Sequence, residues 1–273
     1  FIVENLGPAN FENPLSKALG DEKFVIFTSD EKRILLHPHT SALDASSDIT
    51  KLASFEIAGP RKELYFDPPK AKVAIVTCGG LCPGLNSVIR SLVMQLSHRY
   101  GCQNIYGIKF GYGGLGKNHA EFVKLTPDDV IHIHERGGTI LGSSRGSPPV
   151  SEMVDTLEEE GIDILITIGG DGTMRGALAL LEETQKRGLK ISIVGVPKTI
   201  DNDIPYVRRS FGFETAVGIA STAIHSAHVE AQDAPNGLGI VKLMGRHSGY
   251  IAASATLATG HANYCLIPEV DFS

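Results

Sequence analysis

The chain has 273 residues, of which 42% are hydrophobic and 21% are charged, a balance that supports a folded core and excludes a disordered chain. Its 25 basic and 31 acidic residues give a net charge of −6, which argues against nucleic acid or an anionic membrane as a partner. No apolar run reaches the ~18 residues that a membrane span needs. The four cysteines form no CxxC pair, which is typical of a reducing compartment, so we expect a cytoplasmic protein or an organellar form of one.

Residues 1–70 are expected to form an N-terminal extension. Ser, Asp, Lys and Pro are scattered through this region, and its hydrophobic periodicity is weak. At residues 63–66 the pattern predicts a β-hairpin.

Residues 71–212 predict a nucleotide-binding α/β domain. Three short runs rich in Val and Ile are typical of strands buried on both faces: residues 72–77, 162–168 and 191–196. Two helical patterns alternate with them, at residues 85–97 and 174–186, and a further strand is expected at residues 104–110. This alternation predicts right-handed crossovers, and therefore a three-layer, mostly parallel, Rossmann-like sheet with helices on both faces.

Residues 213–273 predict the start of a second, smaller α/β domain, with a boundary near Gly212. Apolar residues repeat at helical spacing from about residue 213 to residue 232, so one long amphipathic helix is expected there. Two strands are expected after it, at residues 240–243 and 264–267.

Glycine-rich turns follow several predicted strands, at the edge where open α/β sheets bind their ligands. Glycine lets the backbone approach an anion closely, and the helix that follows presents unpaired N–H groups to it. The turn at residues 78–84 matches neither the Walker A motif nor the GxGxxG spacing. A tight turn with positive φ explains this stretch equally well.

Three carboxylates follow two of the predicted strands. Asp171, in GGDGT, could hold Mg²⁺ beside phosphates, or it could merely cap the next helix. Asp201 and Asp203, in PKTIDND, could divide proton acceptance and metal orientation between them, although an Asx-rich turn is the alternative. Their common position at strand ends favours a single acidic site. Arg145 and Arg246 each follow a glycine-containing loop, and together they predict a phosphate clamp.

Five stretches, in this order, resemble the phosphofructokinase family: GGLCPGLNSVIR, GGTILGSSR, GGDGT, PKTIDND and MGRHSGY. The resemblance covers about residues 72–269 and is specific in combination, whereas GGDGT alone also occurs in lipid and NAD kinases. AGPRKELYF and the form of PKTIDND are similar to the plant and protist branch, which is related to the pyrophosphate-dependent enzymes. The resemblance implies an allosteric enzyme of glycolysis that transfers a phosphoryl group from ATP to the 1-hydroxyl of fructose 6-phosphate. It also implies a homo-oligomer, a tetramer by the family's pattern.

The resemblance further implies roles for individual residues. Asp201 would be the general base, and Thr199 would contact the transferring group. Arg246 and Arg145 would stabilise phosphoryl charge. The implied magnesium ligands are Asp171 and Asp203. The residues implied to bind the nucleotide, with Tyr112 on the adenine side, are Gly80, Tyr112, Arg145, Gly170, Asp171, Gly172 and Thr173. The residues implied to bind the sugar phosphate and transferring group are Lys198, Thr199, Asp201, Asp203, Met244, Gly245 and Arg246.

Gly172 is the position that indicates the phosphoryl donor in this family. Pyrophosphate users tend to carry an aspartate there, which would exclude the α-phosphate of a nucleotide, so glycine indicates ATP. Lys198 points the other way, because it resembles the pyrophosphate users, although ATP enzymes of this branch also carry it. A pyrophosphate-dependent phosphotransferase with the same site is therefore an open alternative.

A catalytically silent regulatory subunit is a third alternative. Family members borrow an arginine from a neighbouring subunit, nine positions before the MGR arginine, and this chain has Gly237 there. The resemblance also implies that the chain is a fragment or truncated form with an incomplete sugar site. The intact carboxylates argue against a silent role.

Overall fold

The computed structural model describes residues 3, 5–17, 25–36, 52–117 and 121–272. Its main feature is a five-stranded sheet with the order β7-β6-β5-β8-β9. The strands are β5 (Lys72–Thr77), β6 (Asn104–Ile108), β7 (Phe122–Lys124), β8 (Ile164–Gly169) and β9 (Ser192–Pro197). Neighbouring strands run parallel, except that β6 and β7 are antiparallel. The predicted mostly parallel α/β sheet is confirmed.

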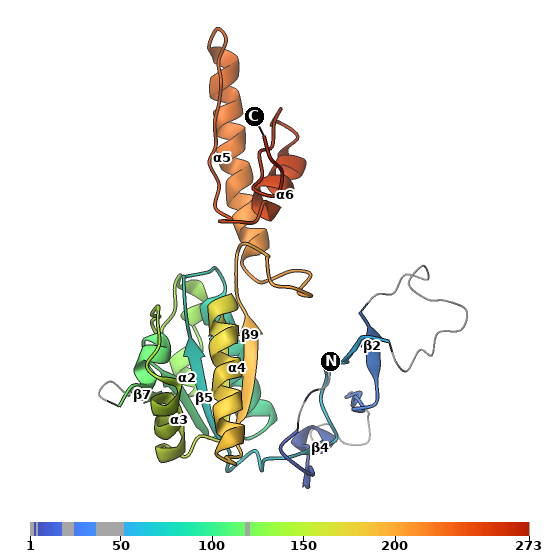
Figure 1. The fold of residues 1–273 in the computed structure, drawn as a ribbon, viewed down its shortest axis with the longest axis vertical. Helices are drawn as coiled ribbons and strands as arrows, with labels where there is room; N and C mark the ends of the chain where they lie inside the picture. Colours follow the sequence, from blue (N-terminus) through green and yellow to red (C-terminus); the bar gives the residue numbers. More distant parts are fainter. Residues whose placement is uncertain (1–2, 4, 18–24, 37–51, 118–120, 273) are drawn as a thin grey trace, which may run out of the picture.

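Helices cover both faces of this sheet. The alternate side chains of the central strand β5 point to opposite faces and enter two separate cores. One core contains side chains of α1 (Leu85–Met94) and α2 (Pro127–Val130). The other contains side chains of α3 (Val150–Glu159) and α4 (Asp171–Lys186), and Figure 1 shows α4 in front of the strands. The three-layer arrangement follows from these two cores.

The predicted helices of this domain form with small shifts at their ends. α1 ends at Met94, and the chain continues as a π-helix over Gln95–Arg99, beyond the predicted end at residue 97. α4 begins at Asp171, three residues before the apolar periodicity begins. The GGDGT turn therefore lies partly inside the first turn of α4.

β9 differs from the prediction of a strand buried on both faces. It is the edge strand of the described sheet, with β8 on one side only, and Val194 is 45% exposed. A strand at the edge has a neighbour on one side only and is less covered by the helices on the two faces, so part of its side chains reach solvent, and a run of Ser, Ile and Val does not reveal such a position.

The N-terminal residues form two small antiparallel pairs. β1 (Phe11–Glu12) pairs with β4 (Glu63–Leu64), and β2 (Arg33–Leu35) pairs with β3 (Ser54–Glu56). The predicted hairpin at residues 63–66 was wrong, because β4 pairs with a segment much earlier in the chain. An extended pattern shows that a segment can pair, but not which partner it finds.

The last two helices stand beyond the carboxyl end of β9 (Figure 1). They are α5 (Phe213–Asp233), as the periodicity predicted, and α6 (Tyr250–Thr259). Apolar side chains of both helices form a third, smaller core. Every helix within the described ranges is too short or too polar to span a lipid bilayer.

The strands predicted at residues 240–243 and 264–267 were wrong. Within the described residues neither segment has a strand beside it, so no ladder of hydrogen bonds forms. Val241 and Leu243 pack on the core of α5 and α6, whereas Ile240 is 82% exposed. The apolar alternation that indicated a strand here reflects packing on two helices.

Candidate active site

The turn after β5 is bonded to the loop that ends in Arg145. The Gly79 N–H donates to the Ser144 carbonyl oxygen over 3.1 Å, and Ser143 Oγ donates to the Gly79 carbonyl oxygen over 2.5 Å. The predicted phosphate turn and the glycine-serine loop therefore form one wall at the carboxyl edge of the sheet.

Lys198 connects this wall to the ends of β8 and β9. Its side chain is buried, and Nζ donates to the Gly80 carbonyl oxygen over 2.8 Å. Its main-chain N–H donates to the Gly169 carbonyl oxygen, also over 2.8 Å. Burial lowers the pKa of Lys198, and the nearby Cys82 and Asp201 oppose that shift. The Lys198 ammonium group thus lies at the candidate site, where it holds the turn after β5 in place.

The loop that carries Asp201 is cross-linked by its own polar groups. Ser210 Oγ donates to the Thr199 carbonyl oxygen over 2.5 Å, and the Ser210 N–H donates to Asn202 Oδ1 over 2.8 Å. The Asp201 N–H donates to Thr199 Oγ1 over 3.0 Å. Asn202 has a φ of +56°, a left-handed conformation that asparagine tolerates better than most residues. These contacts hold the main chain around Asp201 in one conformation.

Asp201 lies among three charged side chains. Burial raises the pKa of its carboxyl group and the negative Asp203 raises it further, whereas Arg246 and Lys198 lower it. Asp201 therefore interacts with one further acid and with two cations, which come from the loop after β9 and from the turn before α6. A carboxylate with a raised pKa beside cations is suited to accept a proton near neutral pH.

Asp171 is placed differently from the other two acids. It is the first residue of α4, and its carboxylate is paired with Arg175, one helical turn later. The two side chains are 67% and 76% exposed. In the described ranges no three His, Cys, Asp or Glu side chains are grouped as ligands of a metal ion. The structure thus brings Asp201 and Asp203 together, and it turns Asp171 toward Arg175.

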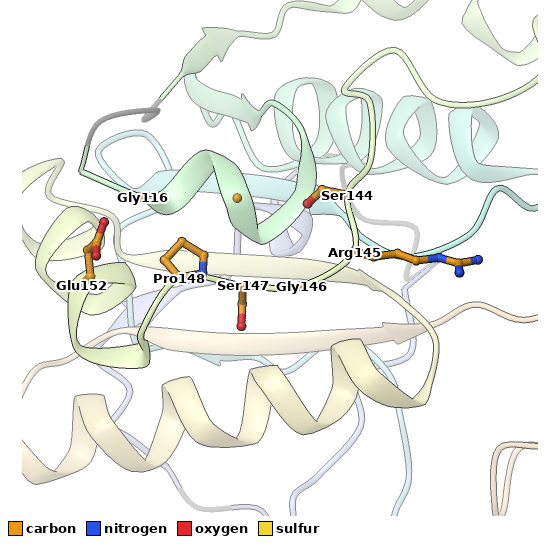
Figure 2. A pocket seen from close by; sticks show the side chains of 8 residues that line it. Gly116, Ser144, Arg145, Gly146, Ser147, Pro148 and Glu152 are labelled. Atoms are coloured by element: carbon orange, nitrogen blue, oxygen red, sulfur yellow. The ribbon is translucent and has the colours of Figure 1, made fainter.

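Arg145 lies beside a cavity of about 310 Å³. The residues that line this cavity, the Arg145 pocket, are Gly113, Gly116, Ser144, Arg145, Gly146, Ser147, Pro148 and Glu152. Figure 2 shows Glu152 and Pro148 at one end and Arg145 extending away at the other. Ser144 Oγ is buried and has no hydrogen-bond partner among the described residues. A buried hydroxyl without a partner is rare, and a ligand in this pocket could satisfy it.

Sequence reasoning missed Ser144 and Glu152. A serine or glutamate in a loop is usually a solvated residue, and no spacing in the sequence sets these two apart. The signal that could have indicated them is only their proximity to Arg145 in the chain.

Tyr112 is part of the core at the edge of this site. It is 5% exposed, and its hydroxyl donates to the Thr173 carbonyl oxygen over 2.9 Å. A Cβ at Gly176 would lie 2.6 Å from the Tyr112 ring, so glycine is needed there for the close approach of α4. Tyr112 therefore fixes the first turn of α4.

We expect Tyr112→Phe to lower the free energy of unfolding by about 1–2 kcal/mol, because the Thr173 carbonyl oxygen loses its buried partner. Urea unfolding monitored by circular dichroism measures the change. Tyr264→Phe is the matched control, because Tyr264 is 87% exposed. Equal stabilities of the two variants would contradict this role for Tyr112.

The glycines of the two turns differ in the space around them. A Cβ on Gly80 or Gly172 would meet no atom within 4 Å, so both positions are open. Gly170 is closer to its surroundings, since its Cβ would lie 3.3 Å from the Lys198 carbonyl oxygen. Thr173 is buried against Gly169, where a Cβ would lie 2.1 Å from the Thr173 hydroxyl. In the GGDGT stretch, there is thus free space beside Gly172, whereas the Thr173 side chain packs against Gly169.

The MGRHSGY stretch forms a tight turn before α6. The Ser248 N–H donates to the Gly245 carbonyl oxygen over 2.8 Å, and Met244 is 73% exposed. Gly245 has a φ of +145° and Arg246 has a φ of +56°, both in the region that favours glycine. A left-handed arginine is strained, and strain of this kind gathers at functional sites.

Comparison with known proteins bears directly on this arrangement. The family model described as phosphofructokinase matches residues 72–273. The chain belongs to the phosphofructokinase family. The family resemblance of the sequence motifs is therefore confirmed, and every site residue considered above lies within the matched range.

Two relatives in this family carry the same functional name. The chain is 48% identical over 273 residues to "ATP-dependent 6-phosphofructokinase" of Borreliella burgdorferi, covering all of this chain and 61% of the relative. It is 54% identical over 216 residues to "ATP-dependent 6-phosphofructokinase 5, chloroplastic" of Arabidopsis thaliana, covering 79% of this chain and 40% of the relative. The chain thus spans about three-fifths or less of the length of these phosphofructokinases.

The fold is also found among solved phosphofructokinases. The crystal structure of a pyrophosphate-dependent phosphofructokinase from Marinobacter aquaeolei matches with a TM-score of 0.63 at 22% identity. The match covers 74% of this chain and 54% of that one. This likeness supports the α/β fold that the structure shows.

Proposed function

We propose that this chain transfers the terminal phosphoryl group of ATP to the 1-hydroxyl of fructose 6-phosphate, the step of glycolysis that gives the bisphosphate. The observation that carries the proposal is Asp201, whose pKa is raised and which lies under the influence of Lys198 and Arg246. The names of the two relatives agree with it.

In this proposal Asp201 accepts the proton of the sugar's 1-hydroxyl while that oxygen bonds to the γ-phosphorus. The bond between the γ-phosphorus and the leaving oxygen of ADP breaks, and ADP carries away the electron pair. Arg246 balances the charge of the phosphoryl oxygens, and Thr199 contacts the transferring group. Since the transition state is loose, positioning and charge supply most of the rate enhancement.

The donor would lie along the carboxyl edge of the sheet. Its nucleoside would enter the Arg145 pocket, where Ser144 offers a hydroxyl. Its phosphates would lie over the turns that carry Gly80 and Gly172, both of which are open. We infer that the buried Tyr112 and Thr173, together with Gly170, act by shaping these turns. Met244 and Gly245 would border the sugar phosphate.

Magnesium would bind with the donor. Mg²⁺ is usually held by one or two carboxylates together with phosphates and water, and Asp171 and Asp203 carry groups of that type. Asp171 would exchange its pairing with Arg175 for the ion, and phosphate oxygens and water would complete the shell. The ion would neutralise charge on the transferring phosphates.

A second candidate is transfer from pyrophosphate to the same sugar hydroxyl. Lys198 favours it, because a lysine at this position resembles the pyrophosphate users of the family, and its ammonium group lies at the phosphate turn, where it bonds to Gly80. The open space at Gly172 favours ATP instead, since it admits the α-phosphate. We retain ATP as the proposed donor.

The domain organisation follows the same proposal. Residues 71–212 would bind the donor, residues 213–273 would begin the sugar-phosphate domain, and residues 1–70 would be an extension. We propose a homo-oligomer, a tetramer by family pattern, that acts in the cytoplasm. The Arabidopsis relative is named as chloroplastic, so an organellar form is the alternative.

We expect the chain to form the bisphosphate from fructose 6-phosphate with ATP at least about tenfold faster than with pyrophosphate. Rates with Mg²⁺ and either donor, followed by ³¹P NMR, test this. Calorimetry with a non-hydrolysable ATP analogue adds a second readout, in which Mg²⁺ binds only when the analogue is present. Faster reaction with pyrophosphate would contradict the choice of donor. Nucleotide binding without product from either donor would instead support the silent subunit.

A further inference from the structure

A buried hydroxyl joins the turn before α6 to the loop that carries Asp201. Ser248 is 8% exposed, and its Oγ donates to the main-chain carbonyl oxygen of Asp201 over 2.9 Å. The Tyr250 N–H approaches the same Oγ at 3.5 Å, from the first turn of α6. The hydroxyl therefore lies between a helix N-terminus and the main chain of the proposed base.

The turn that carries Ser248 also carries Arg246. A Cβ at Gly245 would lie 2.3 Å from the Ser248 carbonyl oxygen, so the turn closes tightly on itself. This closure returns the chain toward the Asp201 loop two residues after Arg246. The same turn thus contacts Asp201 in two ways. Arg246 acts electrostatically on the Asp201 carboxylate, and Ser248 donates a hydrogen bond to the Asp201 main chain.

The frame behind Ser248 is held from the other side. The Gly249 N–H donates to Glu269 Oε1 over 2.7 Å. A Cβ at Gly249 would lie 2.5 Å from Cβ of Ile267, so the C-terminal segment packs directly on this position. The packing of this turn therefore fixes the position of Ser248. Through its hydrogen bond, Ser248 in turn fixes the main chain at Asp201.

The remaining contacts of the Asp201 loop act elsewhere. Ser210 and Asn202 connect the loop to itself, and Thr199 accepts from the Asp201 N–H. None of these three contacts fixes the loop relative to α6. Ser248 supplies that link through the Asp201 carbonyl oxygen, on the side where Arg246 lies.

We propose that Ser248 is a positioning residue for phosphoryl transfer, which holds Asp201 in register with Arg246 and with the sugar hydroxyl. This inference rests on the proposed function. The Ser248 hydroxyl bonds to main-chain atoms, the Asp201 carbonyl oxygen and the Tyr250 N–H, so its effect on the reaction passes through Asp201. Loss of the hydroxyl should change the chemical step more than it changes substrate binding.

Steady-state kinetics on the full chain test this role. In Ser248→Ala we expect kcat to fall about five- to tenfold, with the KM for ATP and for fructose 6-phosphate nearly unchanged. Ser248→Cys keeps the size of the side chain but is a weak donor, so it should show a similar loss. Ser248→Thr keeps the hydroxyl and should restore most of kcat. The matched control is Ser226→Ala in α5, where an exposed hydroxyl bonds to the Thr222 carbonyl oxygen.

A second readout does not depend on activity. Hydrogen exchange at the amides of residues 199–203, followed by mass spectrometry, reports how firmly the Asp201 loop is held. Because Ser248 Oγ binds the Asp201 carbonyl oxygen to the turn before α6, this exchange should be several times faster in Ser248→Ala. Ser248→Thr should exchange at nearly the wild-type rate, and Ser226→Ala should leave the exchange unchanged.

The outcomes separate the two proposals. Lower kcat and faster exchange of residues 199–203 in Ser248→Ala, with recovery of both in Ser248→Thr, support the inference. Unchanged exchange of these residues in Ser248→Ala and Ser248→Cys overturns it, whatever the activity. A wild-type chain that forms no product with either donor overturns the proposed function, and hydrogen exchange then still decides whether Ser248 positions the Asp201 loop.

Discussion

Asp201→Asn is expected to lower kcat for phosphoryl transfer by about 10²–10⁴-fold, the range that general bases commonly supply. Asparagine has the shape of aspartate but cannot accept the proton of the sugar hydroxyl. The hydrogen bonds at the Asp201 N–H and carbonyl oxygen involve only the main chain, so the loop should keep its conformation. Initial rates with ATP and fructose 6-phosphate measure kcat, and calorimetry should show nucleotide affinity changed by less than about threefold.

Asp128→Asn is the matched control, because Asp128 is an exposed aspartate on α2 outside the candidate site. It should keep the wild-type rate. If kcat of Asp201→Asn lies within a few fold of the wild-type value, Asp201 is not the general base.

The raised pKa of Asp201 also gives the direction of two pH effects. The rate should fall on acidification through a pKa above the ordinary aspartate range, since burial and Asp203 both favour the protonated acid. Asp201 contributes its stabilisation fully below the ordinary aspartate pKa, and this contribution is lost as pH rises through the raised value. Asp201→Asn should therefore unfold at a higher temperature than the wild type at neutral pH, with a smaller difference near pH 4.

Gly172→Asp is expected to lower kcat/KM for ATP by about 10²–10³-fold, and to lower any activity with pyrophosphate far less. A carboxylate there would oppose the α-phosphate, and juxtaposed like charges cost several kcal/mol. A Cβ at this position meets no atom within 4 Å, so the aspartate should fit before the donor arrives. An acid in the first turn of α4 also interacts favourably with the helix dipole, so the melting temperature should not fall.

Gly172→Asn separates charge from bulk, because its side chain has nearly the same volume without the charge. We expect it to lose less ATP activity than Gly172→Asp. Rates with both donors for the three proteins are the measurement. Equal losses with ATP and pyrophosphate in Gly172→Asp would contradict the assignment of Gly172 to the donor site.

The central sheet could be predicted from the sequence because its strands are short, apolar and separated by glycine turns. β5 is the strongest case, since its residues from Val73 to Val76 are at most 1% exposed. The pairing of β4 with β1 could not be predicted, because pairing depends on where distant segments meet. The extended segment at residues 240–243 shows the same limit, since its alternation arises from packing on α5 and α6.

The candidate site could be predicted as far as residue type and strand position determine it. Asp201 and Asp203 follow β9, and the structure places Asp201 near Asp203, Lys198 and Arg246. The direction of the Asp171 side chain could not be predicted, because it depends on a local choice between the site and Arg175. Assignment of ligand roles to these residues stays a prediction.

The hydroxyl groups of Ser210 and Ser248 were beyond sequence reasoning. Serine is common in loops, and only the folded chain shows that these two are buried and bonded to the main chain around Asp201. Their contribution depends on where a main-chain carbonyl group lies, which no pattern of residue types encodes.

The left-handed backbone at Arg246 has a consequence for attempts to make this protein more heat-tolerant. Glycine would relieve about 1 kcal/mol of backbone strain at this position, so a screen that rewards survival at high temperature has a reason to select it. The same exchange would remove the guanidinium beside Asp201. Libraries that randomise the turn before α6 should therefore be selected for turnover as well as for thermal endurance.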